Sequence, residues 1–409
     1  MLNTKIVEKR FLGRDTLPAF VLITNSFSWY FPLYIFLTNA LDKLEIAYED
    51  LLIIFGFHYM AVLTFAFIGV TMTEKVFSRS SLLSIWVFLG IIFSPLIILL
   101  KDNSMLSVYL VPLLIGIALG FGFPNCLAYF ADSVDIENRG KLGGIALFTA
   151  LLGMFLVGFL TSVLGFVESV LVLTLWRVWG AAFFQITKNR KGNTKKEIMK
   201  TSYHRIISER PFILYMVPWV MFCLVNFFEY PLQQYHWGIE TSSTVSTVEF
   251  GIASLAALIG GCFADVAGRK RLVILGYVLL GTGYATLSIF PENYISISIY
   301  AFFDGIAWGL FALIFFAVIW GDLANNKVKD KYYLLGTLPF LLSSYISVIV
   351  APFAKLIDIS TSFSLASFFL FLAVVPLMYA PETLPERKLR EKELRGYIEK
   401  AKKIREKFT

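Results

Sequence analysis

The chain has 409 residues, of which 57% are hydrophobic and only 16% are charged. Soluble domains carry about 25% charged residues and must cover their core with a wettable surface, so this composition excludes an ordinary soluble protein. We expect an all-α membrane protein, whose formal charge of +7 is explained by its distribution along the chain rather than by nucleic acid.

The chain begins with four basic residues, Lys5, Lys9, Arg10 and Arg14, and no short apolar segment ends in a cleavage site. We therefore expect no cleaved signal peptide, and we interpret the first apolar run as the first membrane span. A helix needs about 20 mostly apolar residues to cross about 30 Å of hydrocarbon. Runs of this kind predict twelve spans, near residues 17–40, 47–72, 80–100, 104–131, 142–165, 166–187, 211–235, 246–267, 272–290, 295–321, 332–358 and 362–380.

Lys and Arg gather in alternate loops between these spans. All but four of the 36 basic residues fall on the side of the N-terminus; Lys43, Lys101 and Lys355 fall on the other side, and Arg177 lies within a span. Cytoplasmic loops carry an excess of Lys and Arg, so we expect both termini in the cytoplasm. The sequence thus indicates a multi-pass protein of the plasma membrane with no nucleic-acid partner.

The longest inner hydrophilic stretch, residues 188–210, follows six spans and precedes six more. We interpret it as a flexible cytoplasmic linker between a six-helix bundle at residues 1–187 and another at residues 211–380. The basic tail at residues 381–409 repeats apolar residues at helical spacing. It predicts an amphipathic helix on the inner leaflet, with a solvated or frayed tail as the alternative.

The two halves of the chain also echo each other. Asp132 is followed seven residues later by Arg139, and Asp322 is followed seven residues later by Lys329, at an offset of 190 residues. Two parallel six-span repeats with a solute site between them near the midplane are a known plan of transporters.

After the eighth predicted span the chain reads Gly261-Cys-Phe-Ala-Asp265-Val-Ala-Gly268-Arg269-Lys270-Arg271. The glycines let helices approach and turn tightly, Asp265 needs a polar partner, and the basic triplet anchors the loop to the anionic inner face. This stretch resembles the inner-loop motif of the major facilitator superfamily, G-x-x-x-D-x-x-G-R-K/R-K/R. The resemblance implies the major facilitator fold, with twelve transmembrane helices in two six-helix pseudo-repeats.

Two further segments resemble the same superfamily, particularly its sugar-porter branch. They are the run from Asp132 to Arg139 and Gly140, and the terminal Pro381-Glu382-Thr383. In such proteins these charged groups form cytoplasmic clusters that hold the two halves together, a role that the resemblance extends to Asp322 and Lys329.

The first half departs from the motif. After the second span stand only Gly69, Glu74 and Arg79, with no second glycine, so this loop is a degraded copy whose gating role is open. Gln233 and Gln234 lie near the outer end of span 7 rather than at the height typical of sugar porters. Despite these departures from the sugar-porter pattern, sugar is one possible substrate.

Carboxyl groups inside spans are costly and mark functional sites by default. Asp304 lies near mid-depth of the tenth span, and the resemblance places spans 1, 4, 7 and 10 around a central cavity. We interpret Asp304 as a proton carrier, with a structural hydrogen bond as the alternative. Glu229 is a second coupling group or an outer gate, and Glu249 is expected at a solvated helix end.

The remaining polar residues of the spans suggest a solute site. Neutral polar groups at plausible cavity positions, together with an aromatic platform one turn after Asp304, suit a small polar organic solute; they are Asn25, Ser26, Asn125, Asn226 and Trp308. Arg177 is expected in a structural ion pair or snorkelling arrangement, or else at an anionic substrate. His58 is expected to be a packing residue.

These observations predict a secondary active transporter, a proton-coupled symporter of a sugar or organic-acid-like metabolite that works as a monomer. The alternatives are an efflux antiporter of drugs or metabolites and a membrane sensor that does not transport. We expect no enzyme, metal or cofactor, because the sequence offers no metal-ligand cluster, nucleophile–base pair or phosphate loop. The three cysteines, Cys126, Cys223 and Cys262, stand in apolar stretches and are expected to pack.

Overall fold

The structure is a computed structural model that describes residues 16–102, 104–188, 201–324 and 327–384, with Arg390 and Leu394. Among these residues, twelve helical segments are long and apolar enough to cross a membrane, which confirms the predicted all-α fold and the number of spans. The basic N-terminal residues and the predicted amphipathic helix, apart from the residues named, lie outside the described part.

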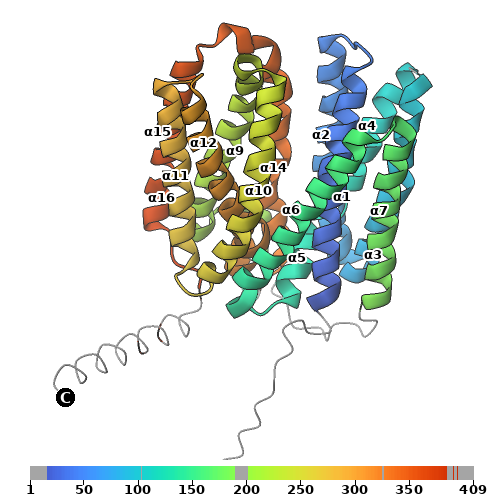
Figure 1. The fold of residues 1–409 in the computed structure, drawn as a ribbon. Helices are drawn as coiled ribbons and strands as arrows, with labels where there is room; N and C mark the ends of the chain where they lie inside the picture. The colour runs from blue at the N-terminus through green and yellow to red at the C-terminus, as the bar shows by residue number, and fades with distance from the viewer. Residues whose placement is uncertain are drawn as a thin grey trace, which may run out of the picture.

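The spans form two groups that lie side by side (Figure 1). The first group, called the first half, comprises α1 (Thr16–Asp42), α2 (Tyr48–Lys75), α3 (Arg79–Phe93) with η1 (Ser94–Asp102), α4 (Met105–Gly120) with α5 (Phe123–Ser133), η2 (Ile136–Asn138) with α6 (Arg139–Val163), and α7 (Phe166–Thr187). The second half comprises α9 (Arg210–Trp237), α10 (Ile239–Ala264), α11 (Arg269–Ile289), α12 (Tyr294–Phe311) with η3 (Ala312–Val318) and α13 (Ile319–Ala324), α14 (Lys329–Val350) with η4 (Ala351–Leu356), and α15 (Ile359–Leu372) with α16 (Val374–Tyr379).

Part of the predicted linker is itself helical. Residues Tyr203–Ile207 form the short helix α8, which begins where the Ser202 side chain accepts a hydrogen bond from the Arg205 N–H. Ile206 on this helix is buried. We expect a flexible linker at residues 188–210 from the sequence. In the structure, its last part, from Thr201 to Arg210, contains a short helix that packs against the protein.

The eighth span differs from its prediction at both ends. We predicted residues 246–267, whereas α10 runs from Ile239 to Ala264. Its first turns are rich in Ser and Thr, which lowers the hydropathy but does not prevent a helix, since their hydroxyls bond back to carbonyls of the preceding turn. Gly238, at a φ of 82°, makes the sharp junction between α9 and α10.

The tenth span changes its helical pitch half-way. Residues Ala312–Val318 form a π-helix between the α-helical segments α12 and α13. A π-helix bonds each N–H to the fifth carbonyl before it, is rare, and is found mostly at functional sites. All seven of these residues are buried, and Phe316 turns toward the first half, where its ring contacts Phe27 on α1.

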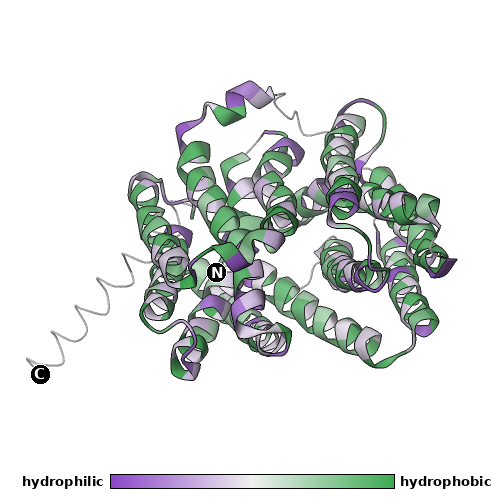
Figure 2. Cartoon of the chain, turned by 90° about the horizontal axis from the view of Figure 1, so that it is seen from above, coloured by the Kyte–Doolittle hydropathy of each residue, from purple (hydrophilic) through white to green (hydrophobic). Residues whose placement is uncertain are grey.

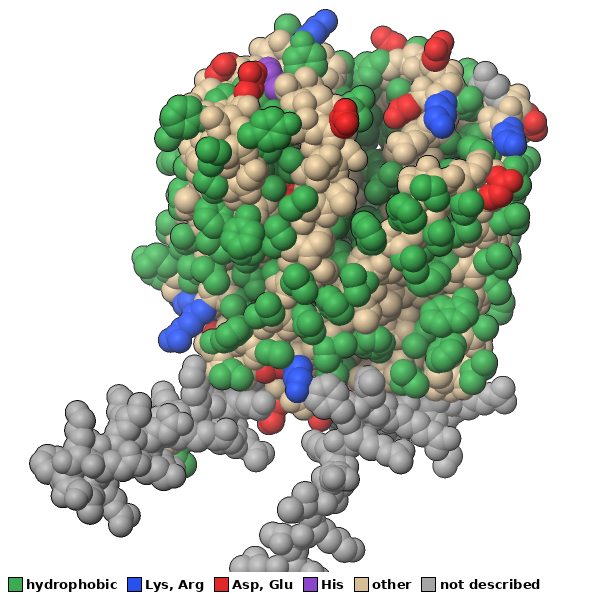
Figure 3. Space-filling view, viewed as in Figure 1, with side chains coloured by type: hydrophobic (Ala, Val, Ile, Leu, Met, Phe, Trp, Pro, Cys, Tyr) green, Lys and Arg blue, Asp and Glu red, His purple; other side chains and the backbone are tan. Residues whose placement is uncertain are grey.

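The surface has the pattern of a membrane protein. Viewed along the helices, hydrophobic residues cover most of the outer faces (Figure 2). In the space-filling view, charged side chains gather at the two ends and hydrophobic ones cover the band between them (Figure 3). Hydrocarbon provides no hydrogen-bond partners, so an apolar band around closed helices is what a bilayer requires.

The two halves meet tightly at one end and separate at the other. At the lower end of Figure 1, α6 and α10 cross so closely that a Cβ added to Gly144 would lie 2.5 Å from the Ala257 carbonyl oxygen. Further up the same helices, Gly158 and Gly251 have open space around them. We call these the closed end and the open end, and a hollow between the halves is visible at the open end (Figure 3).

Candidate functional site

Asp265 joins the two halves at the closed end. It follows α10, and its carboxylate accepts hydrogen bonds from the backbone N–H groups of Gly140 (3.0 Å) and Lys141 (2.7 Å), in the first turn of α6. A negative charge at a helix N-terminus is favourable because it meets unpaired N–H groups and the positive end of the helix dipole. Burial raises the pKa of Asp265, and these bonds together with Arg269 oppose that shift.

Asp322 is the centre of the same end. Its carboxylate binds both Arg139 from the first half and Arg269 from the second half, and all three side chains are buried. Arg269 also donates to the Ile136 carbonyl oxygen just before α6. A charge buried without a partner is costly, so Arg139, whose carboxylate partner belongs to the other half, is stabilised here only while the two halves stay together.

The repeated acid–base pairs of the two halves exchange partners. Arg139 of the first half binds Asp322 of the second half, and Lys329 of the second half binds Asp132 of the first half. The base of each sequence pair therefore binds the acid of the pair in the other half. The sequence identified all four residues, and the structure adds that the pairing is reciprocal.

The degraded loop of the first half also contacts the second half. Arg79 binds Asp132 at 2.5 Å and donates to both oxygens of Asp330 on α14, at 2.9 and 2.5 Å. Glu74 pairs with Lys331 at 2.8 Å. The loop therefore lacks the second glycine but keeps its ion pairs between the halves. We did not identify Asp330 or Lys331 from the sequence, although the alternating charges at the start of α14 were a visible signal.

The terminal segment caps the loop with the strong motif. Glu382 accepts hydrogen bonds from the N–H groups of Arg269 (2.9 Å) and Lys270 (3.3 Å) at the start of α11. Gly268 has a φ of 104°, and a Cβ there would lie 2.4 Å from the Glu382 carboxylate, so a glycine is required for two reasons. A Cβ at Gly261 would meet the Gly140 carbonyl oxygen at 2.6 Å, while Arg271 is exposed.

Above the closed end, aromatic rings from both halves meet. Phe27 contacts Phe316 with ring centroids 5.4 Å apart, and Phe31 contacts Phe340 at 6.0 Å. Trp308 also contacts Phe340 and donates its indole N–H to the Asn226 side chain at 3.2 Å. We call these residues the aromatic layer. Asn226 and Trp308 are therefore the two predicted solute-site residues that the structure brings together at the junction of the halves.

The predicted polar groups of the first half are instead bound inside that half. Asn25 and Ser26 accept hydrogen bonds from Arg177 at 3.0 and 3.1 Å, and the Asn25 amide donates to the Trp176 carbonyl oxygen at 2.8 Å. Asn125 accepts from Thr73 at 3.0 Å. All three predicted residues are buried, so in this conformation they hold helices together.

Arg177 has no ion pair among the described residues. Its guanidinium lies between the rings of Trp29 and Trp86, 4.3 and 4.7 Å from their centroids, and is fully buried. The expected carboxylate partner and the expected snorkelling are both absent within the described chain. Cation–π contacts and the amide of Asn25 take the place of an ion pair.

Two carboxyl groups are buried inside the second half, and a third is partly buried. Asp304 is 2% exposed and accepts a hydrogen bond from Tyr300 at 3.2 Å. Glu229 is also 2% exposed and accepts one from Ser362 at 2.7 Å. Glu249 corrects our expectation of a solvated helix end, because its Oε1 atom is buried and its side chain meets Asp304. The sequence missed this because hydropathy does not show which helix an acidic residue faces.

His58 is a packing residue, as expected. One ring nitrogen contacts the Pro112 carbonyl oxygen at 2.8 Å, and the other lies 3.2 Å from the Tyr30 hydroxyl. Since a carbonyl can only accept, Nδ1 carries the hydrogen and Nε2 accepts from Tyr30. The side chain is thus satisfied within the first half.

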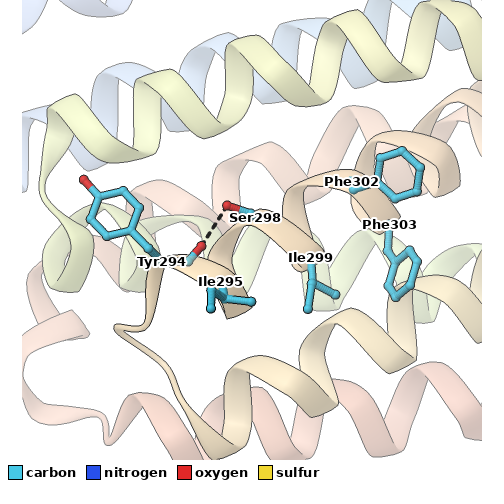
Figure 4. A pocket seen from close by; sticks show the side chains of 6 residues that line it. All are labelled: Tyr294, Ile295, Ser298, Ile299, Phe302 and Phe303. Carbon is cyan, nitrogen blue, oxygen red and sulfur yellow. Dashed lines mark hydrogen bonds between the residues drawn. The ribbon is translucent and has the colours of Figure 1, made fainter.

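One groove lies on the outside of α12. It is lined by Tyr294, Ile295, Ser298, Ile299, Phe302 and Phe303, which all belong to this helix (Figure 4). The Ser298 hydroxyl in this groove donates to the Tyr294 carbonyl oxygen of the same helix. An apolar groove on the lipid-facing band needs no solute to explain it. No group of three or more His, Cys, Asp or Glu side chains in the described ranges is arranged for a metal ion.

The fold of the chain is similar to that of solved structures. The chain matches the crystal structure of a major facilitator superfamily transporter, FucP, in the outward conformation, with a TM-score of 0.70 and 12% identity over 90% of this chain and 100% of that chain. The chain has the major facilitator fold. It also matches the human organic anion transporter MFSD10 (TETRAN), with a TM-score of 0.65 and 14% identity over 89% of this chain and 99% of that chain. No family model and no curated protein sequence matches the chain.

At 12% and 14% identity, the likeness to these two transporter structures establishes the fold. It is consistent with the arrangement of polar groups, which fall into three sets. One set of ion pairs holds the closed end, an aromatic layer joins the halves above it, and buried carboxyl groups lie in the second half.

Proposed function

We propose that the protein is a secondary active transporter that moves a small polar organic solute across the plasma membrane by alternating access, coupled to protons as a symporter. The observation that carries the coupling is Asp304, a buried carboxyl in the tenth span with no Lys or Arg partner among the described residues. Such surroundings favour the protonated form of a carboxyl, and exposure to water on either side would let it exchange its proton.

The closed end is proposed as the inner gate, with both termini in the cytoplasm. In this reading the two halves correspond to residues 1–187 and 211–380, joined by residues 188–210, and the ion pairs of Asp132, Arg139, Asp265, Arg269 and Asp322 stabilise the state that opens outward. Support comes from the basic loops, which gather at this end, and from the hollow at the other end. The fold likeness to a transporter in the outward conformation agrees with that state.

The proposed solute site lies between the halves at the aromatic layer. Asn226 offers an amide and Trp308 an aromatic face beside it, a combination that binds the polar groups and the flat faces of a ring-shaped organic molecule. A sugar or an organic acid fits this chemistry, and one of the matched structures is an organic anion transporter. Membrane lipid, the solute and protons are the only partners this mechanism needs, and a monomer suffices.

The test begins with a screen of solutes for thermal stabilisation of the purified protein. Hits are then assayed for uptake into proteoliposomes with and without a pH gradient. We expect Asp304→Asn to abolish accumulation against a gradient while binding and exchange of solute between the two sides persist, since the amide cannot carry a proton. Glu240→Gln, at an exposed position near the open end, should behave like the wild type.

Other outcomes separate the alternatives. Accumulation at the wild-type rate in Asp304→Asn would exclude proton coupling through this residue and leave it a structural hydrogen bond. Glu229→Gln would then be the next variant. Binding of a solute without any flux would favour the membrane sensor, and accumulation driven in the outward direction would favour the efflux antiporter.

A further inference from the structure

Asp304 does not stand alone in the second half. The helices α10 and α12 approach each other so closely that a Cβ on Gly305 would lie 3.0 Å from the Glu249 carbonyl oxygen and 2.7 Å from the Ile252 side chain. This close approach, which only a glycine allows, brings the Glu249 side chain next to Asp304. The two carboxyl groups are close enough to interact with each other.

The hydrogen bonds around the two carboxyls leave one oxygen of each without another donor. Asp304 Oδ2 accepts from the Tyr300 hydroxyl at 3.2 Å, whereas Asp304 Oδ1 and Glu249 Oε1 are both buried and receive no hydrogen bond from any other described group. An ionised carboxylate can only accept hydrogen bonds. Two carboxyl groups can therefore bond to each other only if one of them is protonated.

The groups that face this pair add no positive charge in the described chain. Tyr284 comes from α11 and Tyr300 from α12, and their hydroxyls lie 3.4 Å apart. Gln233 on α9 donates to the Tyr300 hydroxyl at 3.0 Å. The other titratable neighbours on α9 are Glu229 and Tyr230. Since none of these groups is cationic, a second bare carboxylate in this place would be opposed by burial and by its neighbour.

We propose that Asp304 and Glu249 form one proton-binding unit, a carboxyl–carboxylate pair that holds a single proton between them. Tyr300 keeps its own proton and fixes Asp304 by donating to Oδ2, so its role is positioning. Binding converts two carboxylates and one proton into the shared pair, and release reverses this step when water reaches either oxygen. The inference deepens the proposed function, because the coupling group becomes a pair rather than Asp304 alone, but the shared proton can be measured without transport.

A shared pair and a lone Asp304 carboxyl predict different effects of Glu249→Gln on the bound proton. In the pair, an amide at either position donates N–H to the remaining carboxylate, which then stays ionised, so either single substitution removes the proton. If Asp304 held a proton by itself, Asp304→Asn would remove it and Glu249→Gln would not.

The experiment is infrared spectroscopy of the purified full-length protein in lipid nanodiscs, following the C=O stretch of protonated carboxyl groups as a function of pH. We expect one band in the wild type that is lost in both Asp304→Asn and Glu249→Gln and is kept in Glu240→Gln. The band of Glu229 is identified separately with Glu229→Gln. A band that survives Glu249→Gln with its wild-type pH dependence would overturn the pair.

A sodium titration and a more conservative variant complete the experiment. Sodium is varied at constant pH, and a band that sodium removes would mean that the pair binds a metal cation rather than a proton, which also overturns the proposal. If a single amide variant does not fold, Glu249→Asp keeps the acid but withdraws it by one methylene, and the band of the pair should then shift or split. Should the band behave as expected while uptake ignores the pH gradient, the pair stands and the proposed proton symport fails.

Discussion

Arg177 shows how one buried charge is held without a carboxylate in the described chain. Its guanidinium lies over two indole rings, and its Nη1 atom donates hydrogen bonds to both Asn25 and Ser26, while Nε and the other terminal nitrogen have no described partner. Arginine suits this place because its planar, weakly hydrated group can stack on both faces at once. A compact ammonium could approach only one ring.

We therefore predict that Arg177→Lys lowers the stability of the protein by about 2 kcal/mol, the size of a desolvated cation–π contact. Thermal unfolding of the purified protein measures the loss. Arg210→Lys, at an exposed position at the start of α9, serves as the matched control and should leave the unfolding temperature unchanged. Equal unfolding temperatures for all three proteins would show that the two indoles contribute nothing specific to holding the charge.

For single residues, the sequence predicted which side chains are candidates for the site but not which side chains they contact. Asp304 could be found because a carboxyl in the middle of an apolar run is conspicuous. Glu249 could not be assigned, since it stands among Ser and Thr near a helix end and only the approach of α10 to α12 shows what it meets. Asn25 and Asn125 were placed at a cavity, yet they bond inside the first half because a neighbouring Arg or Thr needed an acceptor.

Among the elements, the crossing of α6 and α10 is the strongest link between the halves. It combines glycine contacts, which let the backbones touch, with the cap that Asp265 places on the first turn of α6. The cap belongs to one half and the helix to the other. Breaking it therefore weakens the closed end without removing any interaction inside either half, except the contact with Arg269.

We predict that Asp265→Asn shifts the protein toward the state that is open at this end, because the amide loses the charge that two N–H groups and Arg269 share. A carboxylate charge at a helix N-terminus contributes about 1 kcal/mol, which is enough to change the ratio of the two states about five-fold. The measurement is the rate at which a thiol reagent labels, in purified protein, a cysteine that replaces Leu313, a buried residue that faces Gly143 of the other half. Glu292→Gln, exposed at the other end, is the control. Unchanged labelling would reduce the inner loop to a topological anchor.

Helix number and most helix bounds could be predicted from hydropathy, since a bilayer fixes the length of a span. The early start of α10 and the π-helix in the tenth span could not. The Ser and Thr residues at the start of α10 lower its mean hydropathy, so the helix is predicted to begin too late. Hydropathy does not depend on helical pitch, so it cannot reveal a π-helix. The break within the fourth span, at Gly122 and Pro124 between α4 and α5, was equally hidden inside an apolar run.

For the whole molecule, orientation is the property on which the proposed gate depends. The first described residue, Thr16, and the last helix turn lead to the same end of the bundle, as an even number of spans requires. That end carries the ion pairs and the basic loops, and the hollow lies at the other. From the positive-inside rule we propose that the closed end faces the cytoplasm.

We predict that a membrane-impermeant thiol reagent added to intact cells labels a cysteine at Glu292 but not one at Ser208, and that permeabilised cells show both. Both positions are exposed, at the open and the closed end respectively. Cys262 is the exposed native cysteine of the described chain and is first replaced by Ser, whereas Cys126 and Cys223 are buried. Labelling of the Ser208 position from outside would invert the topology and with it the placement of the gate.

The π-helix gives the tenth span a property that residue identity alone does not contain. Each residue of a regular α-helix advances the chain by about 100°, whereas a π turn takes in one more residue for the same rotation. If Ala312–Val318 wound as a regular α-helix with every residue kept, Asp322 would turn by about 100° away from Arg139 and Arg269 while Asp304 stayed in place. Deleting a single codon within Ala312–Val318 would remove that excess, and the resulting regular helix would keep Asp322 in register. The faces on which Asp304 and Asp322 lie are therefore linked by the pitch of the span, a property that no motif records.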